Sequence, residues 1–167
     1  MNSHTTSSRF VFSLLAPLLM FAPVAAADPV TFIFGGTASG TLGSSNFTNQ
    51  AYTFTFLGDT ANVASGFGGM YDPTTGTFSI ANTGSGAITP QVDVFAAGGF
   101  ATFFAVNGGN YVALNQPTIG VTVLSNSFGP VVATSSYLQN QTVSTALGSL
   151  NFSGLRGPQT FQSIVMA

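Results

Sequence analysis

The sequence contains no cysteine, tryptophan, lysine or glutamate, and only 4% of its 167 residues are charged. Without cysteine the chain can form no disulfide, no thiolate metal site and no cysteine nucleophile. Its two basic residues, Arg9 and Arg156, are too few to form the basic patch that binds nucleic acid phosphates. These absences exclude several function classes, and the length indicates one domain after any leader.

The amino-terminal segment differs in composition from the rest, because all 20 glycines follow residue 34. Arg9 and the amino terminus precede an apolar run at residues 10–21, FVFSLLAPLLMF, and small residues follow at Ala25 and Ala27. This order predicts a secretory signal peptide over residues 1–27, with a helical apolar part and cleavage between Ala27 and Asp28.

Two alternatives concern this leader. Cleavage one residue earlier, after Ala26, would also satisfy the small-residue pattern. A membrane-spanning helix would need about 20 apolar residues, whereas this run has twelve and contains Pro17. The signal peptide is therefore the favoured interpretation. We also predict no integral membrane segment in the mature chain, residues 28–167, because its closing segment at residues 157–167 is short and is interrupted by Pro158.

Cleavage would leave a mature chain with very few groups for acid–base chemistry. The only histidine, His4, leaves with the leader, so a Ser-His-Asp triad cannot form. A carboxylate pair could be drawn from Asp59, Asp72 and Asp93, but turn or surface roles account for each of them. We predict that the protein is not an enzyme and carries no cofactor.

The mature chain alternates apolar and polar residues over short runs that end in Gly, Asn or Pro. In residues 51–56, Tyr52, Phe54 and Phe56 share one face of a strand, and Thr53 and Thr55 share the other. Similar runs recur along the chain. They predict a single all-β domain over residues 28–167, an antiparallel β-sandwich of jelly-roll or Ig-like type.

One turn is predicted from its local chemistry. The segment Asp72-Pro73-Thr74-Thr75-Gly76 has Pro where φ is preset and Gly where φ can be positive. It predicts a hairpin between Tyr71 and Phe78, with Asp72 serving the turn.

The opening of the mature chain, VTFIFGGTASGTLGSSNFTNQAYTFTFLGDTANV at Val30 to Val63, resembles a group of uncharacterised secreted bacterial β-proteins of the PEP-CTERM-associated type. Phe128-Gly129-Pro130 and Gly148-Ser149-Leu150-Asn151-Phe152 also fit that group. The resemblance implies an extracellular or surface-associated β-domain in an exopolysaccharide-producing Gram-negative bacterium, and it implies no activity. This sequence departs from the group in lacking its sorting tail, so the resemblance does not imply exosortase sorting.

Two pairs of residues are candidate sites. Asp59 and Asn62 are three apart in a predicted loop and could supply oxygens to a weak calcium site, although the sequence favours a structured turn there. Tyr71 and Tyr111 lie beside predicted turns and could stack against a sugar ring, although aromatic residues at strand ends also cap cores.

These observations favour an exported, non-catalytic protein of the cell surface or extracellular matrix, released to the medium or loosely held. Its partners would be extracellular polysaccharide or other matrix proteins, and not nucleic acid. The alternative is a carbohydrate-binding module for matrix polysaccharide. An outer-membrane β-barrel ranks below both hypotheses, because its strands need roughly ten residues and the apolar runs here are mostly five to seven.

Overall fold

A computed structural model of the chain describes residues 27–66, 68–89, 91–98, 100–105, 110–115, 124–136, 138–139 and 141–166. The predicted signal peptide therefore lies outside the described residues, except for Ala27. The elements are β1 (Pro29–Leu42), β2 (Ser45–Asp59), the 3-10 turn η1 (Thr60–Asn62), β3 (Ala64–Gly66), β4 (Gly69–Ile80), β5 (Gly84–Ala87), β6 (Val92–Ala97), β7 (Phe100–Ala105), β8 (Asn110–Asn115), β9 (Phe128–Ala133), β10 (Thr142–Thr145) and β11 (Gly148–Val165).

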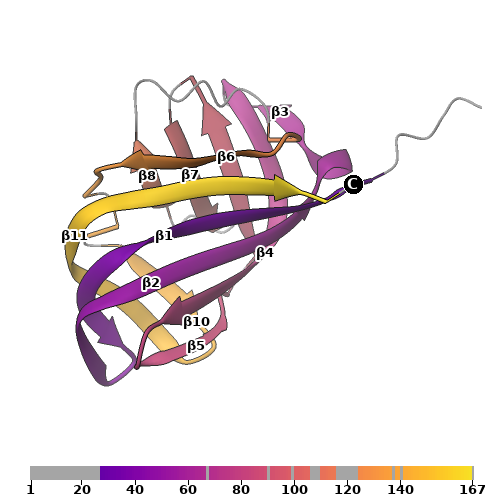
Figure 1. Ribbon diagram of the computed structural model, residues 1–167. Helices are drawn as coiled ribbons and strands as arrows, with labels where there is room; N and C mark the ends of the chain where they lie inside the picture. The colour runs from indigo at the N-terminus through magenta and orange to yellow at the C-terminus, as the bar shows by residue number, and fades with distance from the viewer. Residues whose placement is uncertain are drawn as a thin grey trace, which may run out of the picture.

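The strands form one curled antiparallel sheet with the order β10-β11-β1-β2-β4-β6-β7-β8 (Figure 1). The predicted all-β, antiparallel character is confirmed. β3 and β5 pair with β4, and β9 pairs with β11. β1 lies between β2 and β11 along nearly its whole length, with Phe34 opposite both Phe54 and Phe161.

The sheet curls back on itself at the lower end of Figure 1. Ile88, just after β5, forms an antiparallel bridge with Thr145 of β10. Ala146 N donates to Ala87 O and Thr89 N donates to Ser144 O, both at 2.9 Å. These contacts join the end of β5 to β10, so the backbone groups that take part in them are paired within the chain.

The core is built mainly from phenylalanine. The alternation predicted for residues 51–56 is confirmed, because Tyr52, Phe54 and Phe56 are all buried. Phe103 of β7 packs across the core against the rings of Phe34, Phe54 and Phe56, with centroid separations of 5.3, 4.9 and 4.7 Å. β7 therefore faces β1 and β2 across one shared core.

The predicted hairpin turn at Asp72–Gly76 is wrong. β4 runs without interruption through this segment and changes its partner there. Met70 to Thr74 pair with β6, whereas Thr75 to Ile80 pair with β2. The segment is the point at which the sheet bends, and partners on two sides hold it extended despite its turn-like composition.

Replacing Phe34 by alanine should lower the free energy of unfolding by about 3–5 kcal/mol, because it leaves a cavity among fully buried rings. Urea denaturation of the mature chain measures the effect. Thr48→Ala, at an exposed position of β2, is the control and should change the free energy of unfolding by less than about 0.5 kcal/mol. A loss of less than about 1 kcal/mol for Phe34→Ala would contradict the proposed packing.

Candidate functional site

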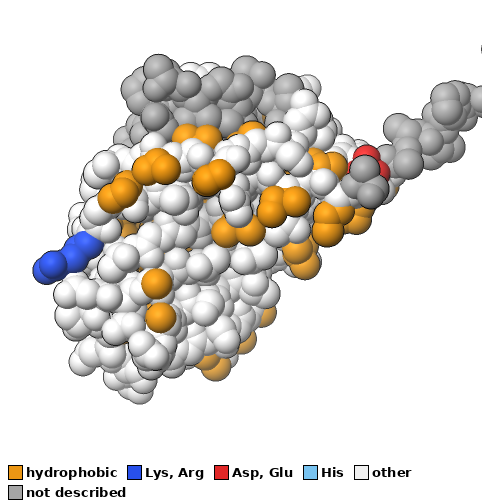
Figure 2. Space-filling model, viewed as in Figure 1, with side chains coloured by type: hydrophobic (Ala, Val, Ile, Leu, Met, Phe, Trp, Pro, Cys, Tyr) orange, Lys and Arg blue, Asp and Glu red, His pale blue; other side chains and the backbone are white. Residues whose placement is uncertain are grey.

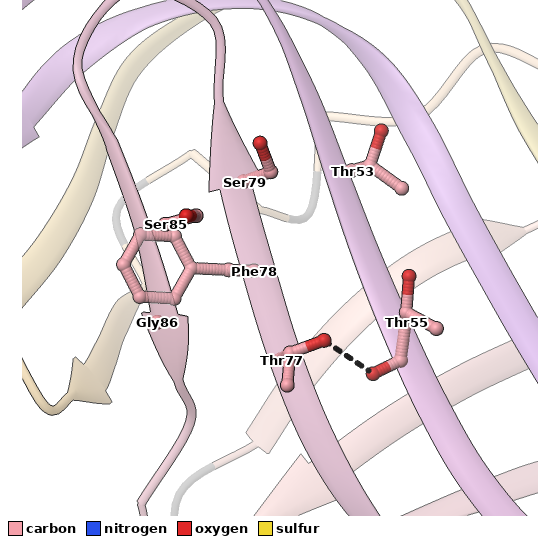
Figure 3. Close-up of a pocket in the computed structure, with 7 residues that line it drawn as sticks. All are labelled: Thr53, Thr55, Thr77, Phe78, Ser79, Ser85 and Gly86. Carbon is pink, nitrogen blue, oxygen red and sulfur yellow. Dashed lines mark hydrogen bonds between the residues drawn. The ribbon is translucent and has the colours of Figure 1, made fainter.

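A shallow groove of about 400 Å³ lies on the outer face of β2, β4 and β5 (Figure 3). Strand alternation creates it, since the residues between buried Tyr52, Phe54 and Phe56 must face outward. The pairing aligns Thr53 with Ser79 and Ser79 with Ser85, and the next row aligns Thr55 with Thr77. Hydroxyl groups from three adjacent strands therefore gather on one surface.

Most of these hydroxyl groups are free to bind a ligand. Thr77 Oγ1 donates to the backbone oxygen of Thr55 at 3.4 Å. The hydroxyls of Thr53, Thr55 and Ser79 make no hydrogen bond within the described part of the chain. Each can donate one hydrogen bond and accept others, so the groove presents a neutral hydrogen-bonding surface.

A second hollow, of about 350 Å³, continues along the same strands. Its lining includes Thr75 on β4 and Ala87, Ile88 and Thr89 at the end of β5. No residue that lines either hollow is titratable at neutral pH. The surface can bind a neutral, hydroxyl-rich ligand, but its described side chains supply no acid, base or charged group for a reaction.

The predicted metal ligands have a structural role in part. Asp59 caps η1, and its Oδ1 accepts a hydrogen bond from Ala61 N at 2.8 Å, as a local turn role would require. Asn62 is exposed at the end of the same turn. Within the described ranges, no group of three or more His, Cys, Asp or Glu side chains is placed to hold a metal ion.

The predicted tyrosines are not brought together in the described structure. Tyr71 is half-buried on β4, opposite Ala64 and Phe95, and its ring lies against the backbone of Gly66. Tyr111 belongs to β8 and pairs with Phe103, and its side chain lies outside the described part of the structure. Sequence analysis missed the hydroxyl groove, although the outward Thr53 and Thr55 were its visible signal.

Asp72 is a second feature that the sequence did not reveal. Its side chain is fully buried, and neither carboxyl oxygen has a hydrogen-bond partner in the described structure. The carboxyl packs over Gly58, where any side chain would collide with Asp72 Oδ2. The absence of a side chain at Gly58 makes the space that Asp72 occupies.

Burial raises the pKa of Asp72 to about 7, because water no longer stabilises its charged form. The nearby backbone amide of Asp59 opposes this shift without reaching hydrogen-bond geometry, and the negative charges of Asp59 and Asp93 add to it. Burial also raises the pKa of Asp93, which is half-buried on β6. Two other aspartates, Asp59 and Asp93, therefore disfavour the charged form of Asp72.

No protein-family model matches this chain, and no curated protein and no solved structure matches it either. Within the described residues, no helix combines the length and the apolar character needed to cross a membrane. The function must therefore be inferred from the arrangement of the chain's own side chains.

The free energy of unfolding should fall as pH rises from about 4 to about 7, because the folded chain retains a proton on Asp72 that the unfolded chain releases near pH 4. The steepest loss expected for one proton is about 1.4 kcal/mol per pH unit. Asp72→Asn should flatten this slope, and Asp93→Asn should leave most of it in place. Urea titrations at several pH values measure both, and an unchanged slope in Asp72→Asn would contradict the assignment.

Proposed function

We propose that this chain is an exported, non-catalytic protein of the cell surface or extracellular matrix that acts by contact. The observation that carries this proposal is the composition of the outer face of the sheet, which presents free hydroxyls and exposed apolar side chains instead of charged groups. Leu57, Val132 and Ile164 are exposed on β2, β9 and β11, and Figure 2 shows apolar atoms spread across this side. Such a surface lacks the charge repulsion that keeps proteins apart.

The finer architecture is also proposed here. Phe103 faces Phe34, Phe54 and Phe56 across the core, which supports two opposed layers of a jelly-roll-like sandwich. In this arrangement β1, β2 and the second half of β4 form one layer, while β6 and β7 form the other. The hydroxyl groove then lies on the outer side of the first layer.

A second candidate function is binding of a neutral matrix polysaccharide, and the hydroxyl groove favours it. A neutral polysaccharide presents many hydroxyls and no charge, so it matches a groove with free hydroxyls and no titratable side chain. We propose the groove rather than Tyr71 as the contact surface, since Tyr71 already packs against the hairpin of β3 and β4.

Export predicts a mature chain that begins at Asp28. The full-length chain should be expressed in a Gram-negative host and recovered from the periplasm or medium, where intact mass should correspond to residues 28–167. Because signal peptidase needs small residues at Ala25 and Ala27, a variant with Ala27→Phe should remain unprocessed. Recovery of the unaltered chain with residues 1–27 still attached would contradict the export hypothesis.

If the groove binds polysaccharide, dextran cast into a native gel should retard the mature chain. The triple variant Thr53→Val, Thr55→Val and Ser79→Ala should be retarded less, with an apparent affinity for dextran about tenfold lower. Each change removes one hydroxyl but keeps a side chain suited to a strand. Thr48→Val is the matched control and should bind normally.

Two outcomes would overturn the groove assignment. Equal retardation of the wild type and the triple variant would show that the groove is not the contact surface. Loss of binding in Tyr71→Ala alone would restore the tyrosine site that the sequence predicted. If dextran, cellulose fragments and starch all fail to retard the wild type, the carbohydrate hypothesis is rejected and the contact function is left to protein partners.

A further inference from the structure

The first residues of the domain are fixed at the corner where β2 meets η1. The backbone nitrogen of Asp28 donates to Thr60 Oγ1 at 3.1 Å, and Thr60 N donates back to Asp28 O at 3.0 Å. Pro29 pairs with Asp59, and Pro29 O accepts from Met166 N at 3.0 Å. The nitrogen of Asp28 therefore has a defined position against the end of β2.

This corner carries only negative side-chain charge in the described structure. Asp28 and Asp59 lie at the corner itself, and the buried Asp72 of β4 interacts with the charges of Asp59 and of Asp93 on β6. Because burial raises the pKa of Asp72 to about 7, Asp72 is largely neutral at pH 6.5 and adds little to the charge of the corner. The adjoining η1, β3 and the end of β11 contribute no titratable side chain.

The only described side-chain cation is remote from this corner. Arg156 pairs with Thr37, eight residues farther along β1 than Pro29, which corresponds to about 26 Å of strand. Figure 2 shows the arginine atoms and the visible acidic atoms at opposite ends of the molecule. The acidic corner therefore lacks a compensating charge as long as the nitrogen of Asp28 is part of a peptide bond.

We propose that cleavage between Ala27 and Asp28 supplies this missing cation, so that removal of the leader stabilises the fold at the corner where it was attached. The inference rests on the export proposed above. It assigns the new α-ammonium group a structural role as the charge partner of the acidic corner, in which the nitrogen keeps its hydrogen bond to Thr60 Oγ1.

The chemistry of cleavage provides the charge. Hydrolysis by a signal peptidase consumes one water, and Ala27 leaves with the new carboxylate. Asp28 keeps the nitrogen, which takes up a proton and becomes an ammonium group with three donors in place of one amide N–H. An α-amino group has a pKa near 8, so the charge is present at neutral pH.

The position of the ammonium group favours interaction with Asp59. Residues paired across antiparallel strands have Cα atoms about 4.5–5.5 Å apart. Because Pro29 pairs with Asp59, the backbone nitrogen of Asp28, one residue earlier, is held near Asp59. Thr60 Oγ1 accepts one hydrogen from Asp28 N, which leaves two for nearby oxygens and water. An amine displaced outward by one residue, on Ala27, would lose this placement because Ala27 is exposed before β1 begins.

The test compares three mature chains that differ only at the amino terminus: a free Asp28 amine, an acetylated Asp28, and a chain that starts at Ala27. At pH 6.5 and low salt, the free Asp28 chain should melt about 1–4 °C above the other two. At pH 10, where the amine is neutral, the three melting temperatures should converge. The side-chain titrations are common to all three chains and cancel in the comparison.

A matched variant tests the acidic partner. Asp59→Asn removes the charge but keeps an oxygen that can cap η1, so the fold should survive and the advantage of the free amine should shrink. Equal melting temperatures at pH 6.5, or an advantage that persists undiminished at pH 10, would overturn the inference. Because the amino termini are defined in advance, this result is independent of whether cells export the chain, which intact mass tests separately.

Discussion

The packing of phenylalanine rings from β1, β2, β7 and β11 is the interaction on which the rest of this structure depends. Phe34 stacks on Phe161 at 4.0 Å between centroids and meets Phe56 and Phe103 at 5.7 and 5.3 Å. The chain has no cysteine and almost no charge, so burial of apolar surface must supply most of its stability. The same rings fix the strand register, because a shift of one residue would turn them outward to solvent.

This core leaves the outer face free for function. Once Phe54 and Phe56 point inward, Thr53 and Thr55 must point outward, and pairing with β4 aligns them with further hydroxyls. Side chains on this face do not have to satisfy core packing, and the hydroxyls among them can hydrogen-bond without charge. The bridge between Ile88 and Thr145 then closes the lower end, so backbone hydrogen-bonding groups there are used within the chain.

Local alternation predicted the class of the fold and the buried face of β2, because a period of two depends only on neighbouring residues. It failed at Asp72–Gly76, where turn-forming residues are held in a continuous strand by β2 on one side and β6 on the other. The periodicity still contained a signal. Counting back by twos from buried Phe78 and Ile80 places Asp72 on the inner face, where the structure has it. The groove could not be predicted in the same way, because the sequence does not state that β4 lies between β2 and β5.

The scarcity of charge makes the position of each charged group more consequential. In a highly charged protein one aspartate has many charged partners. Here Asp72 is buried without a hydrogen-bond partner in the described structure, and the two charged residues that act on it, Asp59 and Asp93, are also acidic. The fold accommodates it because Gly58 leaves room and because burial favours the neutral acid. The cost of the arrangement is therefore concentrated at the corner where β1 begins. A single positive charge has more effect there than on any evenly charged surface, since no other described cation competes for the same carboxylates. If the leader is removed before Asp28, as we propose, the new amino terminus places its charge at this corner, and the electrostatics of the domain are then coupled to its maturation.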